Sequence, residues 1–142
     1  MCIADLDDVA KVEAESYTEP WPKDIFYSEI VKNEHAHYFV VEKNGEVIAF
    51  SGMWMVLDDA QVTNIAVAPQ YRGNKIGERL FAHMCQKAIY LGVKRLSLEV
   101  RASNIIAQKM YRKFGLVPGG IRKKYYTDNH EDAIVMWVNF RS

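Results

Sequence analysis

The amino-acid sequence predicts an α/β (α+β) domain in which a mixed, mostly antiparallel sheet is flanked by helices. Three observations lead to this prediction. Asn44-Gly45, a dipeptide that favours tight hairpin turns, separates two strand-like runs. The stretch 62–91 has the pattern of a buried strand, a turn and an amphipathic helix. A further alternating run, 95–100, follows that helical crossover, so it should lie parallel to the strand before the helix.

The first thirty-odd residues are expected to form two helices. Apolar residues recur at near-helical spacing from Ile3 to Ala14, and Asp5 is a candidate N-terminal cap. The segment 19–22, Glu-Pro-Trp-Pro, interrupts this pattern, which resumes at Asp24. Its Trp21 has two interpretations, a plug that fills a packing gap or a wall of a substrate groove.

The sheet is expected to contain one parallel strand pair among antiparallel neighbours. Val62, Ile65 and Val67 mark the central strand, and Pro69 ends it because proline cannot donate a hydrogen bond to a neighbouring strand. The expected strands are 37–42, 47–56, 62–67, 95–100, 120–126 and 133–140.

Two helices are expected after the central strand. From Ile76 to Leu91 apolar residues line one helical face, and Gly92 stands where a left-handed cap would end the helix. Ser103-Asn104 can cap a helix over 105–114, which Gly115 would end.

Length, charge and cysteine content limit the class of protein. The 142 residues are expected to form one domain, 1–142, and the formal net charge of +0 disfavours a broad nucleic-acid-binding surface. Cys2 and Cys85 provide no disulfide framework, and no secretory or membrane-spanning segment is recognisable, so we expect a cytoplasmic protein without direct nucleic-acid or membrane partners. No metal site is expected, because the histidines are scattered: His35, His37, His83 and His130.

A phosphate-binding turn is predicted where the central strand leads into the long helix. Free backbone N–H groups and the positive end of the helix dipole meet at such a turn. Gly73 and Gly77 have neither the G-x-G-x-x-G spacing of dinucleotide folds nor the G-x-x-x-x-G-K-[ST] pattern of nucleotide P-loops. The phosphate ligand must therefore belong to another class.

The segment Arg72-Gly-Asn-Lys-Ile-Gly77 resembles the acetyl-CoA loop of GNAT acetyltransferases, Arg/Gln-x-x-Gly-x-Gly/Ala after a strand ending in A-V-x-P. Lys75 replaces the middle glycine, and we expect a negative φ there because a lysine with positive φ costs about 1–2 kcal/mol. The resemblance implies acetyl-CoA as the cosubstrate. It also implies contacts from Ile65, Ala66, Val67, Arg72, Gly73, Asn74, Lys75, Ile76, Gly77, Glu78 and Asn104, with the Val67 N–H as an oxyanion donor.

In this family the parallel strands, here 62–67 and 95–100, splay apart and hold the pantetheine arm of the cofactor between them. The expectation is physically reasonable, because a splayed pair exposes N–H and C=O groups that two pantetheine amides can satisfy like an added strand.

Further segments are similar to the RimI-like protein N-terminal acetyltransferases. Leu98-Glu-Val-Arg-Ala-Ser-Asn104 matches L-E-V-R-x-S-N, and Ala107 leads to Tyr111 as in A-x-x-x-Y-x-x-x-G-F, with Leu116 in place of the Phe. Similarity also covers 19–21, 64–67 and the tail from Arg122 to Met136. Only Met1–Ile3 would remain for the first strand of the family.

Acetyl transfer to an amine requires a neutral amine and a proton for the departing thiolate. A peptide α-amine has a pKa of about 7.7–8.0 and a lysine amine one of about 10.4, so a single carboxylate acting through water suits the α-amine better. The resemblance makes Glu99 the candidate base and Tyr111 the candidate acid. A structural carboxylate at a strand end and a core aromatic residue are the alternatives.

The sequence thus predicts an acetyl-CoA-dependent Nα-acetyltransferase whose partner is a protein N-terminal peptide. By resemblance, the substrate is the N-terminal alanine of a small-subunit ribosomal protein. The alternatives are acetylation of a small-molecule amine or a lysine, and a non-catalytic acyl-CoA-binding module.

Overall fold

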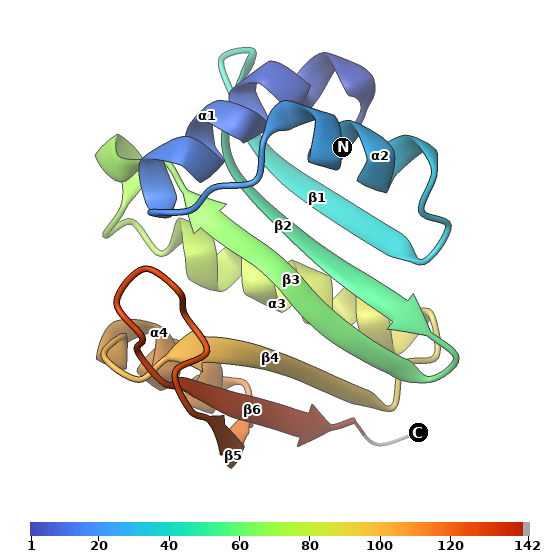
Figure 1. Cartoon of the computed structure of the whole chain (residues 1–142). Helices are drawn as coiled ribbons and strands as arrows, with labels where there is room; N and C mark the ends of the chain where they lie inside the picture. Colours follow the sequence, from blue (N-terminus) through green and yellow to red (C-terminus); the bar gives the residue numbers. More distant parts are fainter. Residues whose placement is uncertain (141–142) are drawn as a thin grey trace.

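One six-stranded sheet in the order β1-β2-β3-β4-β6-β5 forms the centre of the protein (Figure 1). The structure, a computed structural model, describes residues 1–140. Within these described residues only β3 and β4 pair in parallel, which confirms the predicted mixed, mostly antiparallel sheet. The strands are β1 (Ala36–Lys43), β2 (Glu46–Val56), β3 (Asp59–Val67), β4 (Arg95–Arg101), β5 (Val117–Arg122) and β6 (Ala133–Asn139).

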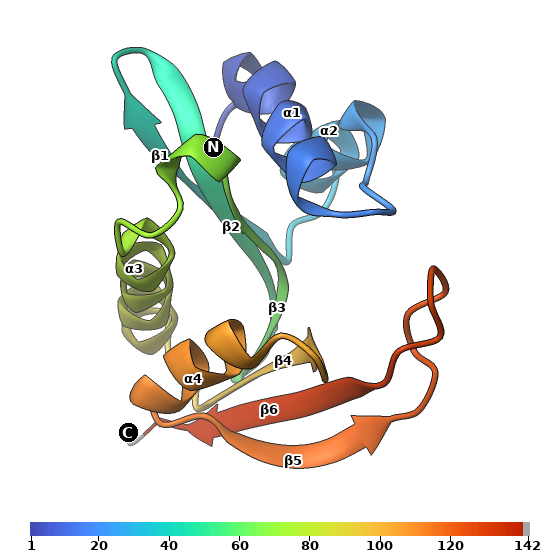
Figure 2. The same ribbon diagram turned by 90° about the vertical axis from the view of Figure 1, so that its left-hand side faces the viewer.

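Helices cover both faces of the sheet, so that two hydrophobic cores form (Figure 2). One core lies beneath α1 and α2, where Phe26 packs between Trp21, Tyr38 and Phe50 with ring centroids 5.4–6.3 Å apart. The other lies between the sheet and the remaining two helices, around Phe81 and Tyr111. The helices are α1 (Leu6–Ser16), α2 (Lys23–Val31), α3 (Ile76–Tyr90) and α4 (Ile105–Lys113), with 3₁₀ turns η1 (Ile3–Asp5) and η2 (Pro69–Tyr71).

Several residues adopt the backbone conformations or contacts that the sequence predicts. Asn44 and Gly45 both adopt positive φ, 53° and 80°, as a two-residue hairpin turn requires. Gly92 and Gly115 follow α3 and α4 in left-handed conformation, with φ of 92° and 90°. Trp21 packs against Phe26, which agrees with the packing interpretation of this residue.

The chain differs from expectation at its start and near its end. Residues 1–3 form no strand; instead the amino terminus donates a hydrogen bond to the Tyr38 carbonyl. Asp5 precedes α1 but does not cap it, because its carboxylate accepts from the Cys2 N–H. The strand expected over 120–126 is β5 at Val117–Arg122, an edge strand where Pro118 is tolerated.

β3 contains a β-bulge in its pairing with β2, near the point where β3 and β4 cease to pair. Gly52 of β2 pairs with Asn64 and Met53 pairs with Val62, so Thr63 is the extra residue in β3. The parallel pairing with β4 covers only residues 59–61 and stops two residues before Thr63. Bulges bend the strand that carries them. The bend therefore accounts for the gap that opens between β3 and β4 beyond this point.

Candidate active site

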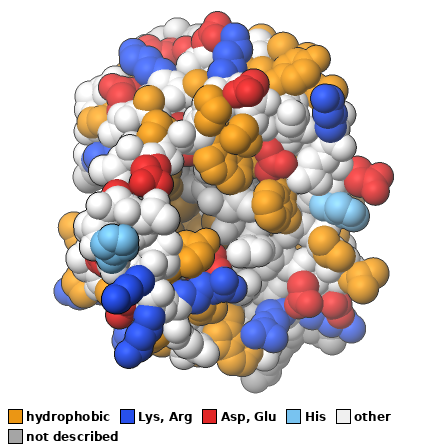
Figure 3. All heavy atoms as spheres, viewed as in Figure 1, with side chains coloured by type: hydrophobic (Ala, Val, Ile, Leu, Met, Phe, Trp, Pro, Cys, Tyr) orange, Lys and Arg blue, Asp and Glu red, His pale blue; other side chains and the backbone are white. Residues whose placement is uncertain are grey.

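A cavity of about 590 Å³ fills the gap between the diverging strands. Figure 3 shows the surface hollowed between the α1–α2 layer and the lower half of the sheet. The cavity contains eight of the residues predicted from the sequence to form the site: Ile65, Ala66, Val67, Arg72, Gly77, Glu99, Asn104 and Tyr111.

Side chains donate hydrogen bonds to two backbone carbonyl groups on the edge of β3 that faces the gap. The Tyr17 hydroxyl donates to the Ile65 carbonyl at 2.7 Å, and Arg72 Nε donates to the Val67 carbonyl at 3.0 Å. Since N–H and C=O of one strand residue point to the same side, the N–H groups of Ile65 and Val67 also point into the gap. The edge therefore offers mainly donors to a molecule bound there.

The turn before α3 has two left-handed residues, Gly73 with φ of 85° and Lys75 with φ of 61°. The predicted negative φ at Lys75 is therefore wrong: the tight entry into α3 requires positive φ even though the residue is a lysine. No side chain of residues 1–140 caps the helix start at Lys75. The first N–H groups of α3 thus remain available to an anion, as at phosphate-binding helix ends.

Neighbouring side chains in this turn have structural partners. Arg72 reaches inward, where Nη2 donates to Ser16 Oγ at 3.1 Å in addition to its bond to Val67. Asn74 Nδ2 donates to the Tyr71 carbonyl. Glu78 pairs with Lys113 at 3.5 Å, so its charge is partly balanced near the helix start. Ile76 begins the helix beside them.

A hydrogen bond and an ion pair hold the Glu99 carboxylate at the rim of the cavity. Gln61 Nε2 donates to Oε2 at 3.2 Å, and Arg122 Nε lies 3.3 Å from Oε1. The Glu99 side chain is 12% exposed, whereas that of Arg122 is 58% exposed. The carboxylate is thus oriented by β3 and β5 while still reaching the cavity.

Tyr111 projects from α4 into the other side of the same cavity. Its ring packs 5.0 Å from that of Phe81, and the residue is only 5% exposed. Its hydroxyl makes no hydrogen bond within residues 1–140, so it is free to donate to a bound molecule. Burial, together with the nearby Tyr17 and Tyr126 hydroxyls, raises the pKa of Tyr111 above the ordinary value of 10. The residue is therefore protonated throughout the neutral range.

Asn104 caps α4, as its position in the sequence predicts. Its Oδ1 accepts from the Ala107 N–H at 3.1 Å, and the residue lines the cavity.

Sequence reasoning missed two tyrosines that complete the cavity. Tyr17 ends α1 and Tyr126 follows β5, and both line the cavity beside Tyr111. Burial is the main cause that raises the pKa of each, in both cases to about 12. The Tyr-Tyr pair at 125–126 resembled part of a strand, and no local pattern marks Tyr17.

Arg101 was also missed, although it lies in the motif that contains Glu99. Its guanidinium forms two hydrogen bonds with Asp128, at 2.8 and 3.1 Å, and reaches Glu131 at 3.3 Å. It also stacks 4.0 Å from the Tyr126 ring centroid. Hydrogen bonds from Thr18 and then Arg101 lower the pKa of Asp128 to about 2. Arg101 therefore anchors the loop between β5 and β6.

That loop is joined to the loop between α1 and α2. Thr18 Oγ1 donates to Asp128 at 2.6 Å, and Thr127 Oγ1 donates to Glu19 at 2.7 Å. These two contacts, here termed the loop clasp, bridge residues more than 100 positions apart in the sequence. The clasp lies at the end of the sheet where β3 and β4 are farthest apart (Figure 1).

Glu13 of α1 connects the loop before α2 to β3 through hydrogen bonds. This buried carboxylate accepts from the Trp21 N–H at 3.0 Å and from Asn64 Nδ2 at 3.4 Å. Burial raises the pKa of Glu13 despite these hydrogen bonds.

Cys85 is likewise buried, which raises the pKa of its thiol to about 11 and makes it a poor nucleophile.

Within residues 1–140 no group of three or more metal-ligating side chains is present. In the same part of the chain no helix is long and apolar enough to cross a bilayer.

The chain belongs to the Acetyltransferase (GNAT) family, whose profile matches residues 6–116. A putative [ribosomal protein bS18]-alanine N-acetyltransferase of Bacillus subtilis (strain 168) is 54% identical over 138 residues, covering 97% of this chain and 91% of that protein. The crystal structure of the ribosomal-protein-S18-alanine N-acetyltransferase from Escherichia coli matches with a TM-score of 0.92 and 35% identity, covering 100% and 92% of the two chains. A GNAT family acetyltransferase from Elizabethkingia anophelis, with acetyl-CoA bound, shares the fold at 19% identity, with a TM-score of 0.76 over 92% and 89% of the chains.

The left-handed Lys75 leads to a stability prediction. A non-glycine residue there costs about 1–2 kcal/mol, and glycine costs about 0.4–1 kcal/mol through the unfolded chain. Lys75→Gly should therefore have a larger free energy of unfolding than Lys75→Ala, by up to about 1.6 kcal/mol, and should unfold at a higher urea concentration. Both variants lose the same charge, so the comparison isolates the backbone. A glycine variant less stable than the alanine variant would contradict the assigned conformation.

Proposed function

We propose that this protein transfers the acetyl group of acetyl-CoA to the N-terminal amine of a protein. The proposed substrate is the N-terminal alanine of a small-subunit ribosomal protein, as the names of the relatives from B. subtilis and E. coli suggest. The observation that carries the proposal is the position of Glu99 and Tyr111 on different elements lining one cavity.

Acetyl-CoA fits three features of this chain. The uncapped start of α3 offers N–H groups to its pyrophosphate, and the Ile65 N–H faces the gap where a pantetheine amide would lie. The Val67 N–H is the proposed donor to the oxygen that becomes negative during transfer. When bound, acetyl-CoA supplies the activated acetyl group. The chain's own residues then have to position the amine and move two protons.

Glu99 is the proposed base. It accepts, through a water molecule, the proton that the nitrogen of the neutral α-amine must lose as it attacks the thioester carbon. Gln61 and Arg122 hold the carboxylate in place for this step. An α-amine with a pKa of about 7.7–8.0 is already partly neutral at pH 7, so this assistance is small compared with what a lysine would need.

Tyr111 is the proposed acid. Its free hydroxyl donates a proton to the sulfur as the carbon–sulfur bond breaks, which yields the amide and coenzyme A with protons balanced. A phenol with an ordinary pKa of about 10 is about 1.5 pKa units weaker as an acid than a thiol of pKa about 8.5, which corresponds to about 2 kcal/mol. Burial raises the pKa of Tyr111 further. Proton donation must therefore accompany bond breaking rather than precede it.

Mutation of the two residues should produce different pH profiles. Glu99→Gln should lower kcat by about 10²–10⁴-fold, and the remaining rate should rise with pH as more α-amine becomes neutral. Tyr111→Phe should also lower kcat, without recovery at high pH, because alkaline solution supplies protons less readily. In the wild type the raised pKa of Tyr111 should prevent any loss of rate up to about pH 10.

The measurement is kcat against pH for the three proteins, with acetyl-CoA affinity determined by calorimetry as the control for folding. Equal recovery of both variants at high pH would refute the acid role of Tyr111. Full activity in both would refute the catalytic proposal.

The class of substrate can be tested directly. Peptides beginning with alanine and bearing a free α-amine should be acetylated, whereas the same peptides with a blocked N-terminus and an internal lysine should react far more slowly. Release of free thiol from acetyl-CoA measures both reactions. Equal rates would favour acetylation of lysine or small amines, and no reaction with any amine despite acetyl-CoA binding would favour a non-catalytic binding module.

A further inference from the structure

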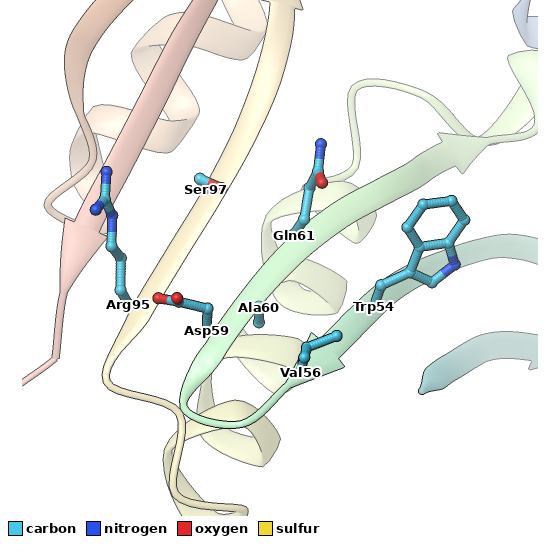
Figure 4. Close-up of a pocket in the computed structure, with 7 residues that line it drawn as sticks. All are labelled: Trp54, Val56, Asp59, Ala60, Gln61, Arg95 and Ser97. Atoms are coloured by element: carbon cyan, nitrogen blue, oxygen red, sulfur yellow. The ribbon is translucent and has the colours of Figure 1, made fainter. Parts of the chain in front are cut away.

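A second cavity, of about 300 Å³, lies where β3 and β4 are still paired (Figure 4). Asp59 and Gln61 of β3 stand opposite Arg95 and Ser97 of β4, and Trp54 of β2 forms the far wall. Gln61 also donates to Glu99 in the active-site cavity. The two cavities are therefore neighbours on one face of the sheet and share a hydrogen-bonded pair.

The charged side chains that line this second cavity are Asp59 and Arg95. The Asp59 side chain is exposed and forms no ion pair or hydrogen bond with any other described residue. Arg95, the cation of the cavity, is engaged instead with the Trp137 ring, whose centroid lies 4.5 Å from its Cζ. Figure 4 shows the Arg95 guanidinium directed away from Trp54, on the side of β6.

The wall formed by Trp54 is held in place before any ligand arrives. Its Nε1 donates to the buried Glu29 carboxylate at 2.6 Å, and Tyr38 donates to the same oxygen at 2.8 Å. Trp54 as a whole residue is nevertheless 38% exposed. An exposed indole face near a carboxylate without a partner suits a cationic side chain with an apolar stem.

The spacing of residues along β4 indicates which residue of a bound peptide would lie at this cavity. Ser97 and Arg95 are two and four residues from Glu99, or about 7 and 13 Å at about 3.3 Å per strand residue. An extended peptide whose amine lies at Glu99 would reach the same distances at about its third to fifth residue. The second cavity lies at the end where β3 and β4 pair, and the loop clasp lies at the opposite end, where the two strands diverge (Figure 1).

We propose that this second cavity binds a lysine or arginine side chain at about the third to fifth residue of the substrate, through the Asp59 carboxylate and the face of Trp54. The proposal rests on the N-terminal acetylation proposed above.

The test uses alanine-initiated peptides of serine and glycine with a single lysine placed at each position from the second to the eighth. In the wild type, kcat/KM should be greatest with lysine at the third to fifth position, about 3–10-fold above the all-neutral peptide, and glutamate there should lower it. The change should appear mainly in KM, and it should weaken at high salt because the pair is exposed.

Asp59→Asn should abolish the preference for lysine. Asp58→Asn, which removes the same charge from the adjacent turn residue outside the cavity, should retain it. A flat lysine profile in the wild type, or equal loss of the preference in both variants, would overturn the assignment of this cavity. If the enzyme acetylates the neutral peptide but shows no preference for lysine at any position, only this inference is wrong. If it acetylates no peptide with a free amine, the proposed function is wrong as well.

Discussion

The bend of β3 at Thr63 is the constraint on which the site depends. Without the extra residue opposite Gly52, β3 would continue beside β4 and their backbone groups would satisfy one another. Tyr38 packs directly over Gly52 beside the bulge, which requires glycine because a Cβ there would lie 2.2 Å from the Tyr38 ring. The Tyr38 hydroxyl is held in turn by Glu29 and approaches Thr63 Oγ1 at 3.5 Å. Gly52, Tyr38 and the buried Glu29 carboxylate thus pack together beside the bulged residue.

Side chains from other parts of the chain also form hydrogen bonds with the open edge of β3. Tyr17 and Arg72 occupy the carbonyl groups of Ile65 and Val67, and so the edge is left as a row of donors. Arg101 performs a comparable task on the other side, where it holds the loop that carries Tyr126 and the loop clasp. Binding groups are therefore positioned on a rigid scaffold before a ligand arrives, which lowers the entropic cost of binding.

Much of the fold could be predicted because its signals are local. The Asn44-Gly45 hairpin and the glycines after α3 and α4 depend on backbone preferences of single residues. The edge strand β5 was displaced in the prediction, because Pro118 and two glycines disfavour a strand unless it lies at an edge. Gly119 is required there by packing, since its Cβ would overlap the Trp137 ring, and no local pattern reveals this.

The site could be predicted only where it lies in recognisable motifs. Glu99, Tyr111 and Asn104 were found through such motifs, and the structure brings them to one cavity. Tyr17, Tyr126 and the role of Arg101 could not be found, because their partners lie 27 to 48 residues away or are defined only by the shared cavity. At Lys75 the residue type predicted negative φ, and the geometry of the turn into α3 overrode that preference.

The most direct test of this account is amide hydrogen exchange at the edge of β3. Addition of acetyl-CoA should slow exchange at Ile65 and Val67, whose N–H groups face the gap, and should leave Ala66 little changed because its N–H points toward β2. Site-resolved exchange measured by NMR with and without acetyl-CoA provides the comparison. Unchanged exchange at Ile65 and Val67 in the saturated protein would contradict the claim that the bulge exists to present this edge to the cosubstrate.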